Sequence, residues 1–121
     1  MTNAFPIFLS LVKAVGMDEA VILQKLHSWL IQPGARIVDG KPWARPTYEE
    51  WETYFPARLF SEIRHTLKNL ERRGLVISAC DDQDPMYQMQ WYTIDYDQVA
   101  TIMPQSTSRL RQLYRTILLR G

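Results

Sequence analysis

The sequence predicts a mostly helical α+β domain, and three observations indicate it. The chain has 121 residues, 46% of them hydrophobic, which suits one domain with a sizeable core. Several segments repeat apolar residues at steps of three and four, the spacing of an amphipathic helix. Two short segments in the second half are rich in β-branched and aromatic residues, as strands are. We therefore expect several helices and a small β-sheet.

The first third of the chain predicts two helices. Residues 5–15 are apolar enough for a short helix that ends at Gly16. Asp18 is placed to cap a second helix, which runs from Glu19 to about Gln32 and ends at a Pro-Gly pair. The residues expected on its inward side are Val21, Ile22, Leu26, Trp29 and Leu30.

The middle of the chain predicts a tight turn and a short helix. Asp39-Gly40 lies between two short extended runs, a strong signal for a β-hairpin. Thr47, with Glu50 three residues later, matches a capping box, in which each side chain binds a backbone N–H of the other residue. The box is expected to open a helix from about Tyr48 to Tyr54.

A third main helix is predicted from about Leu59 to Arg73, and Gly74 ends it. Strands are expected at Leu75–Ala79 and at Met89–Ile94, joined by a polar loop. A helix, a short connection, a second helix and a two-stranded wing form the element order of a winged helix-turn-helix domain. The fold class predicted is therefore α+β, mostly helical, with this architecture and an added C-terminal helix.

The last part of the chain predicts two further helices. Tyr96–Ile102 is expected to form a short one. The final segment SRLRQLYRTILLRG places its apolar residues on one helical side and Arg111 and Arg115 on another. We expect a winged-helix domain over residues 1–98 and a basic amphipathic helix over residues 99–121. That helix either completes the core of the same domain, forms a homodimer, or binds DNA or another subunit.

Charge is segregated along the chain, although the net charge is only +1. Residues 58–73 carry five basic and two acidic side chains, and residues 105–121 carry four arginines and no acid. Residues 74–104 carry five aspartates and neither lysine nor arginine. This pattern favours a polyanion or an acidic partner for the basic segments; the alternative is an unevenly charged, solvated surface.

The helix predicted over residues 59–73 has an apolar side and a cationic side. Its apolar side, an arc of roughly 100°, consists of Leu59, Phe60, Ile63, Leu67 and Leu70. In a winged helix the outward side enters the DNA major groove, where base edges accept bonds from Arg, Lys, Ser and Asn. The residues predicted to contact double-stranded DNA are Arg58, Ser61, Arg64, His65, Lys68 and Arg72, with Arg111 and Arg115 of the C-terminal helix.

The chain contains, in this order, the segments MDEAVILQKLHSWL, KPWARPTYEEWETYFP, IRHTLKNLERRGLVIS and QWYTIDY. Over about residues 5–98 they closely resemble the N-terminal winged-helix domain of phage and prophage replication proteins, the replisome organisers and DnaD-like initiators. The resemblance implies a non-enzymatic protein that binds origin DNA, loads a helicase and acts in replication initiation or regulation. Positions that match the recognition helix of the family are Ser61, Glu62, Arg64, His65 and Lys68.

Two features depart from that family. Position 59 is usually a small polar cap and is Leu here, which forfeits about 1 kcal/mol of capping. The wing tip is usually basic, whereas Asp81, Asp82 and Asp84 stand there and would repel phosphates. With about four phosphate contacts, a plot of log DNA affinity against log salt concentration would have a slope of roughly −3.6.

The acidic wing supports a second hypothesis. The chain would be a protein-interaction module that keeps the winged fold and binds a host, replication or other nucleic-acid-processing protein through Asp81, Asp82 and Asp84. Reversal of these three charges to lysine separates the hypotheses. Lost partner binding would favour the module, and a simple gain in DNA affinity would favour DNA binding.

No residue pattern predicts an enzyme, a metal site or a cofactor. Cys80 is the single cysteine, and the sequence shows no phosphate-binding loop or nucleophile motif. Without a signal peptide or a long apolar segment, we expect a cytoplasmic protein that does not contact membranes. The aromatic residues expected to pack in the core, rather than to stack on bases, are Trp29, Trp43, Trp51 and Trp91.

Overall fold

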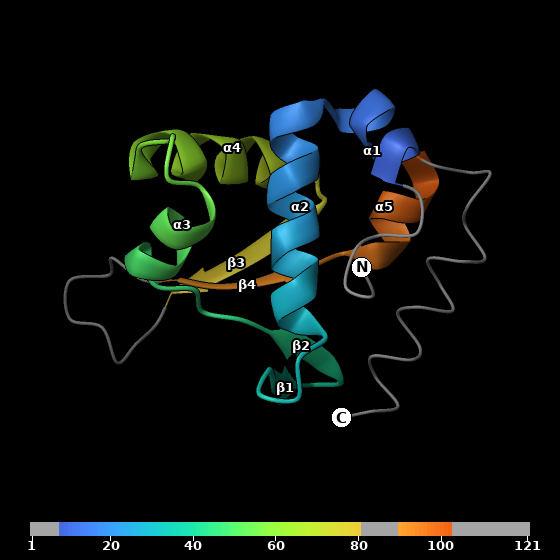
Figure 1. Ribbon diagram of the computed structural model, residues 1–121. Coiled ribbons are helices and arrows are strands. Elements are labelled where there is room, and N and C mark those ends of the chain that lie inside the picture. The colour runs from blue at the N-terminus through green and yellow to red at the C-terminus, as the bar shows by residue number, and fades with distance from the viewer. Residues whose placement is uncertain (1–7, 81–89, 103–121) are drawn as a thin grey trace.

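The computed structural model describes residues 8–80 and 90–102. Within these ranges the chain is mostly helical α+β, with five helices and two antiparallel sheets of two strands each. Helix α2 runs through the middle of the molecule, with α3 and α4 on one side of it and α1 and α5 on the other (Figure 1). The coarse fold class predicted from the sequence is confirmed.

Gly16 separates the first two helices, α1 (Phe8–Val15) and α2 (Met17–Leu30). Its φ of 99° is open to glycine and unfavourable for other residues, so the chain can turn there without a linker. The prediction that Asp18 caps α2 is wrong. Gly16 is the N-cap, and Asp18 lies inside the first turn, where it forms an ion pair with Arg58.

The predicted hairpin is confirmed in β1 (Arg36–Val38) and β2 (Lys41–Trp43). Its two turn residues, Asp39 and Gly40, both have positive φ, as a type I′ turn requires. Ala44 exchanges two backbone hydrogen bonds with Tyr92, of 3.0 and 2.8 Å, which attach the hairpin to the second sheet.

Helix α3 (Tyr48–Tyr54) begins at the predicted capping box. The amide of Thr47 donates to Glu50 Oε1 at 2.9 Å, and the amide of Glu50 donates to Thr47 Oγ1 at 3.0 Å. Trp51 anchors the helix: it is 1% exposed, and its ring meets that of Trp29 edge-on with 4.9 Å between centroids. A burial of this size fixes a helix that is too short to be stable alone.

Helix α4 (Phe60–Arg72) ends in a Schellman motif around Gly74, whose φ is 76°. The amide of Gly74 donates to the Glu71 carbonyl at 2.9 Å, and that of Leu75 donates to the Leu70 carbonyl at 3.0 Å. Because the N–H of Leu75 is committed to α4, the following strand begins one residue later than predicted.

The second sheet pairs β3 (Val76–Cys80) with β4 (Gln90–Ile94) in antiparallel register. Helix α5 (Tyr96–Ile102) follows at once, with the predicted bounds, and Asp95 caps it by accepting from the Gln98 amide at 3.0 Å. Val99 and Ala100 of this helix are buried in the common core.

One core joins all five helices and the second sheet. Its largest fully buried side chains are Trp51, Tyr96, Leu11, Leu23, Leu26, Leu30, Ile63, Leu67, Leu70, Leu75 and Ile94. Buried polar contacts reinforce it: His27 Nδ1 of α2 and the hydroxyl of Tyr96 on α5 lie 2.5 Å apart. Within the described ranges, no helix has both the length and the apolar character needed to cross a membrane.

Candidate nucleic-acid interface

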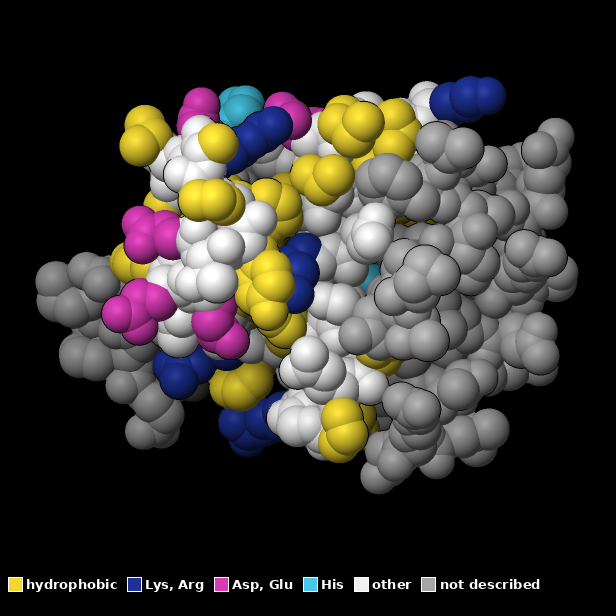
Figure 2. All heavy atoms as spheres, in the orientation of Figure 1, with side chains coloured by type: hydrophobic (Ala, Val, Ile, Leu, Met, Phe, Trp, Pro, Cys, Tyr) yellow, Lys and Arg dark blue, Asp and Glu magenta, His cyan; other side chains and the backbone are white. Residues whose placement is uncertain are grey.

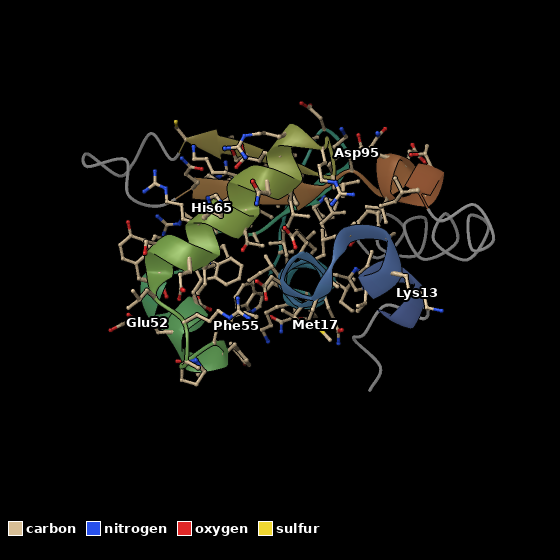
Figure 3. The ribbon with its side chains drawn as sticks, turned by 90° about the horizontal axis from the view of Figure 1, so that it is seen from above. Lys13, Met17, Glu52, Phe55, His65 and Asp95 are labelled. Carbon is tan, nitrogen blue, oxygen red and sulfur yellow. The ribbon has the colours of Figure 1, made fainter. Side chains whose placement is uncertain are left out.

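Helix α4 is held by one side and presents the other to solvent. Ile63, Leu67 and Leu70 are at most 1% exposed and pack against α2 and the β3–β4 sheet. Figure 3 shows the helix from above, with His65 on the side that faces away from α2. The exposed residues on this outward side are Ser61, Glu62, Arg64, His65, Lys68 and Arg72, which we call the α4 outer surface.

The start of α4 explains one wrong prediction. Leu59 was expected to face the core, but it precedes the helix as N-cap and is 69% exposed. Its side chain has no acceptor atom, so half of a capping box is missing. The other half is present, because the Leu59 amide donates to Glu62 Oε1 at 2.8 Å. Glu62 therefore caps the helix at its positive end.

Arg58 is committed to an intramolecular ion pair. Its Nη2 lies 2.6 Å from Asp18 Oδ1, and both side chains remain partly exposed. The hydrogen bond and charge of Arg58 lower the pKa of Asp18, and those of Asp18 raise the pKa of Arg58. A phosphate that bound Arg58, which precedes α4, would have to compete with this carboxylate, so the predicted phosphate contact of Arg58 is weakened.

Two other basic residues of the same segment have structural contacts. Arg73 donates to the carbonyls of Ala14 and Val15, at 3.1 and 3.4 Å, and so satisfies the last turn of α1. Arg72 donates to Asn69 Oδ1 one turn earlier on α4. The cluster of five basic residues read from the sequence thus overstates the charge that α4 offers to a ligand.

Arg64 and Lys68 remain available. The side chains of these two residues and of His65 form no hydrogen bond or ion pair with any residue in the described part of the chain. Lys68 lies four residues after Arg64 and three after His65, so its side chain neighbours both of them on the helix surface. A rigid row of cationic and polar groups can bind phosphates and donate to base edges.

The acidic residue at the other end of α4 is turned toward the second sheet. Glu71 Oε1 accepts from the Ser78 hydroxyl of β3 at 2.9 Å. Next to this contact, burial, together with the nearby charge of Glu71, raises the pKa of Tyr92 to about 12. Glu71 therefore contributes to the attachment of the sheet and adds little negative charge to the α4 outer surface.

Helix α3 limits the direction from which a polyanion can approach. Glu49, Glu50 and Glu52 are all exposed, and Figure 2 shows acidic side chains gathered over this helix. Like charges of this kind repel phosphates, with an effect that decreases over about 10 Å at 0.1 M salt. These carboxylates therefore disfavour the approach of a polyanion to α4 from the α3 side.

Part of the predicted site lies outside the described residues: Arg111, Arg115 and the acidic residues Asp81, Asp82 and Asp84. Comparison of the chain with protein-family models, with curated proteins and with solved structures found no match. The resemblance to phage replication proteins therefore stays a prediction from the residues alone.

The tryptophans divide into two groups. Trp29 and Trp51 are 8% and 1% exposed, which confirms the expectation of core packing for them. Trp43 and Trp91 are only half-buried, and both line a cavity with Arg36 and Arg45, so the expectation is wrong for these two. Each of these two tryptophans follows a proline or a polar residue on a short strand. This local pattern does not indicate how deeply the side chain is buried.

Proposed function

We propose that the chain is a DNA-binding protein without enzymatic activity, in which α3 and α4 form a helix-turn-helix and β3–β4 its wing. The α4 outer surface would enter the major groove of double-stranded DNA. The observation that carries the proposal is the pair Arg64 and Lys68: two cations whose side chains form no hydrogen bond or ion pair within the described chain, on a helix whose opposite side is buried.

The dimensions of α4 suit this use. Its 13 residues span roughly 20 Å, and the major groove admits one helix about 12 Å wide. Ser61, Arg64 and His65 lie in the first half of the helix, where winged and related helix-turn-helix proteins contact base edges. Lys68 and Arg72 lie further along and would bind phosphates of one strand.

The charge predicts modest affinity. The acidic α3 and the pairing of Arg58 leave few cations for phosphates, so nonspecific binding would be weak and its dependence on salt shallow. Arg111 and Arg115 of the C-terminal segment would add further cations that bind phosphates. A homodimer would have twice as many of these cations as one chain.

The biological role we propose, replication initiation or regulation in a phage or mobile element, rests on the resemblance of the four sequence segments described above. A cytoplasmic location accords with it. The described elements follow one another in the order α3, α4, β3 and β4. This is the order that the resemblance implies, and it supports the proposed role.

The decisive variant is Lys68→Glu. Reversal of one exposed charge on α4 should weaken binding to a 20-base-pair duplex about tenfold at 50 mM salt, because an attraction becomes a repulsion. Lys13→Glu is a matched control: Lys13 is also exposed, and Figure 3 shows it on α1, far from His65. Fluorescence anisotropy with labelled duplex measures both. Equal affinity of the two variants would exclude α4 from the interface.

A second candidate is a protein-interaction module. The exposed carboxylates of Glu49, Glu50 and Glu52 favour it, because an acidic helix side suits a basic protein surface. Host proteins retained on the immobilised chain would be compared with those retained on Glu49→Lys/Glu52→Lys and on Asp81→Lys/Asp82→Lys/Asp84→Lys. A specific partner lost from either variant, without any duplex binding by the parent chain, would favour this candidate over DNA binding.

A further inference from the structure

A cavity of about 350 Å³ lies at the end of the molecule where α2 and the β1–β2 hairpin meet. Its walls come from the end of α2, the hairpin, the start of α3 and strand β4. A smaller hollow of about 180 Å³ shares three of its lining residues, Arg36, Trp43 and Trp91. The two hollows thus form one groove around these three side chains, which we call the Trp–Arg groove.

This groove and the α4 outer surface lie on different sides of the β3–β4 sheet. Successive residues of a strand point to opposite faces. Ser78 and its cross-strand partner Tyr92 face α4, since Ser78 binds Glu71 there. The next pair, Ala79 and Trp91, therefore faces away from α4, into the smaller hollow. A ligand in the groove would not be held by α4.

The groove combines aromatic rings with guanidinium groups. The centre of the Trp91 ring lies 5.4 Å from the guanidinium carbon of Arg36 and 5.8 Å from that of Arg45. Trp43 is paired with Arg36 across the hairpin and contributes a second half-exposed ring. The packing of a protein core does not require guanidinium groups beside a partly exposed indole ring, so packing alone does not account for this arrangement.

Arg36 is available for an anion. Within the described residues its side chain has no hydrogen bond and no ion pair; the side-chain contact recorded for it is the one with the Trp91 ring. Such a cation–π contact at an exposed site is worth about 0.5–1 kcal/mol, less than a bidentate bond to phosphate. Arg36 can therefore bind a phosphate while its stem stays against the ring.

We propose that the Trp–Arg groove binds an unpaired nucleotide, with the base stacked on Trp91 or Trp43 and the phosphate on Arg36. The volume lies near the lower end of the range for small-molecule sites, which fits one nucleotide unit. Gln32 and Glu50 stand in the same wall with amide and carboxylate groups that can bond base edges. An apolar peptide would offer no polar group to Gln32 or to the guanidinium of Arg36.

The nucleotide belongs either to a single-stranded nucleic acid or to a free mononucleotide. Both present a base that can stack and a phosphate that can bind an arginine. Stacking on aromatic rings tolerates any base, and a backbone phosphate near the ring supplies the charge. This proposal does not depend on duplex binding by α4, since the two sites use different residues on different elements.

The experiment measures binding of a labelled ten-residue thymidine oligonucleotide at 50 mM salt, by anisotropy and by quenching of tryptophan fluorescence. Loss of one stacked base reduces affinity by roughly tenfold. Trp91→Leu and Arg36→Gln should each produce such a loss, while Lys68→Glu should leave single-strand binding within about twofold. Melting curves of each variant establish that it is folded. Arg36→Gln alters an exposed side chain and keeps the test valid if Trp91→Leu does not fold.

Two further ligands define the chemistry. If thymidine monophosphate quenches the fluorescence of the wild type but not that of Trp91→Leu, the result supports the site. It also shows that a free nucleotide is sufficient for binding. An oligomer of abasic sugar phosphates should bind at least tenfold more weakly than the thymidine oligomer. Equal binding of the abasic oligomer, unchanged affinity in both groove variants, or binding only of an acidic phenylalanine-containing peptide would overturn the proposal.

Discussion

Position 59 shows how one side chain can leave a helix incompletely capped. Leu59 has the extended backbone of an N-cap, with φ −74° and ψ 149°, and Glu62 already fills the reciprocal half of the box. Leu59→Ser should therefore stabilise the fold by about 1 kcal/mol, since its hydroxyl can accept from the Glu62 amide. Chemical denaturation measures this gain, with Leu59→Ala as the control that removes the same apolar atoms. Equal stability of the two variants would contradict the account of the cap.

The same residues show what a sequence reveals at this scale. Thr47 and Glu50 are three positions apart, so their mutual capping follows from local geometry and could be predicted. The ion pair between Asp18 and Arg58 joins residues forty positions apart. The residues next to Asp18 and next to Arg58 do not indicate this ion pair. Asp18 was therefore predicted to cap the nearest helix, although it lies two residues after the N-cap position.

Gly74 tests the connection between α4 and the second sheet. A methyl group at this position would meet only the Gln98 side chain, at an ordinary 3.6 Å, so the cost of Gly74→Ala comes from its φ of 76°. A non-glycine residue with left-handed backbone costs about 1–2 kcal/mol. Gly34→Ala, with nothing within 4 Å and no positive φ, is the control. A thermal melt that shifts equally for both would refute this explanation.

His27 links α2 and α5 and makes the stability of the fold depend on pH. Burial lowers the pKa of His27 to about 4 from an ordinary 6.5, so between these values the unfolded chain binds more protons. Stability is full above about pH 6.5 and decreases as the pH falls toward 4. From pH 7.5 to 5 this residue should account for a loss of about 2 kcal/mol.

The variant His27→Gln isolates that contribution. Glutamine keeps a group that can bond the Tyr96 hydroxyl but does not titrate, so urea unfolding at the two pH values should show a smaller decrease for the variant. Carboxylates titrate in both proteins and cancel in the comparison. The same decrease in both would mean that His27 is not neutral in the folded state or is readily solvated.

At the scale of elements, prediction succeeded where local signals were complete. The bounds of α3 and α5 were predicted correctly: a capping box opens α3, and the apolar pattern within each helix is short and regular. The strand after α4 was placed one residue early, because the Schellman motif takes the N–H of Leu75. Whether the N–H of Leu75 bonds to the helix or to the sheet depends on three-dimensional geometry, and the residue types alone indicate this geometry only in part.

The whole molecule divides its surface by chemistry. Cations without partners in the described chain lie on α4, carboxylates lie on α3, and indoles with arginines surround the groove at the far end of α2. The charge segments of the sequence predicted the first of these, although Arg58 and Arg73 proved to be structural. The groove could not be predicted, since its walls come from four separate parts of the chain.

The central claim is that Arg64 and Lys68 of α4 bind the phosphates or bases of duplex DNA. The most direct test is the salt dependence of duplex affinity for the parent chain and for Arg64→Gln/Lys68→Gln. With about four phosphate contacts, the parent slope of log affinity against log salt should be roughly −3.6, and the slope of the double variant, which removes the phosphate contact of Lys68, should be shallower by about 0.9. Identical slopes for the two proteins would contradict the claim.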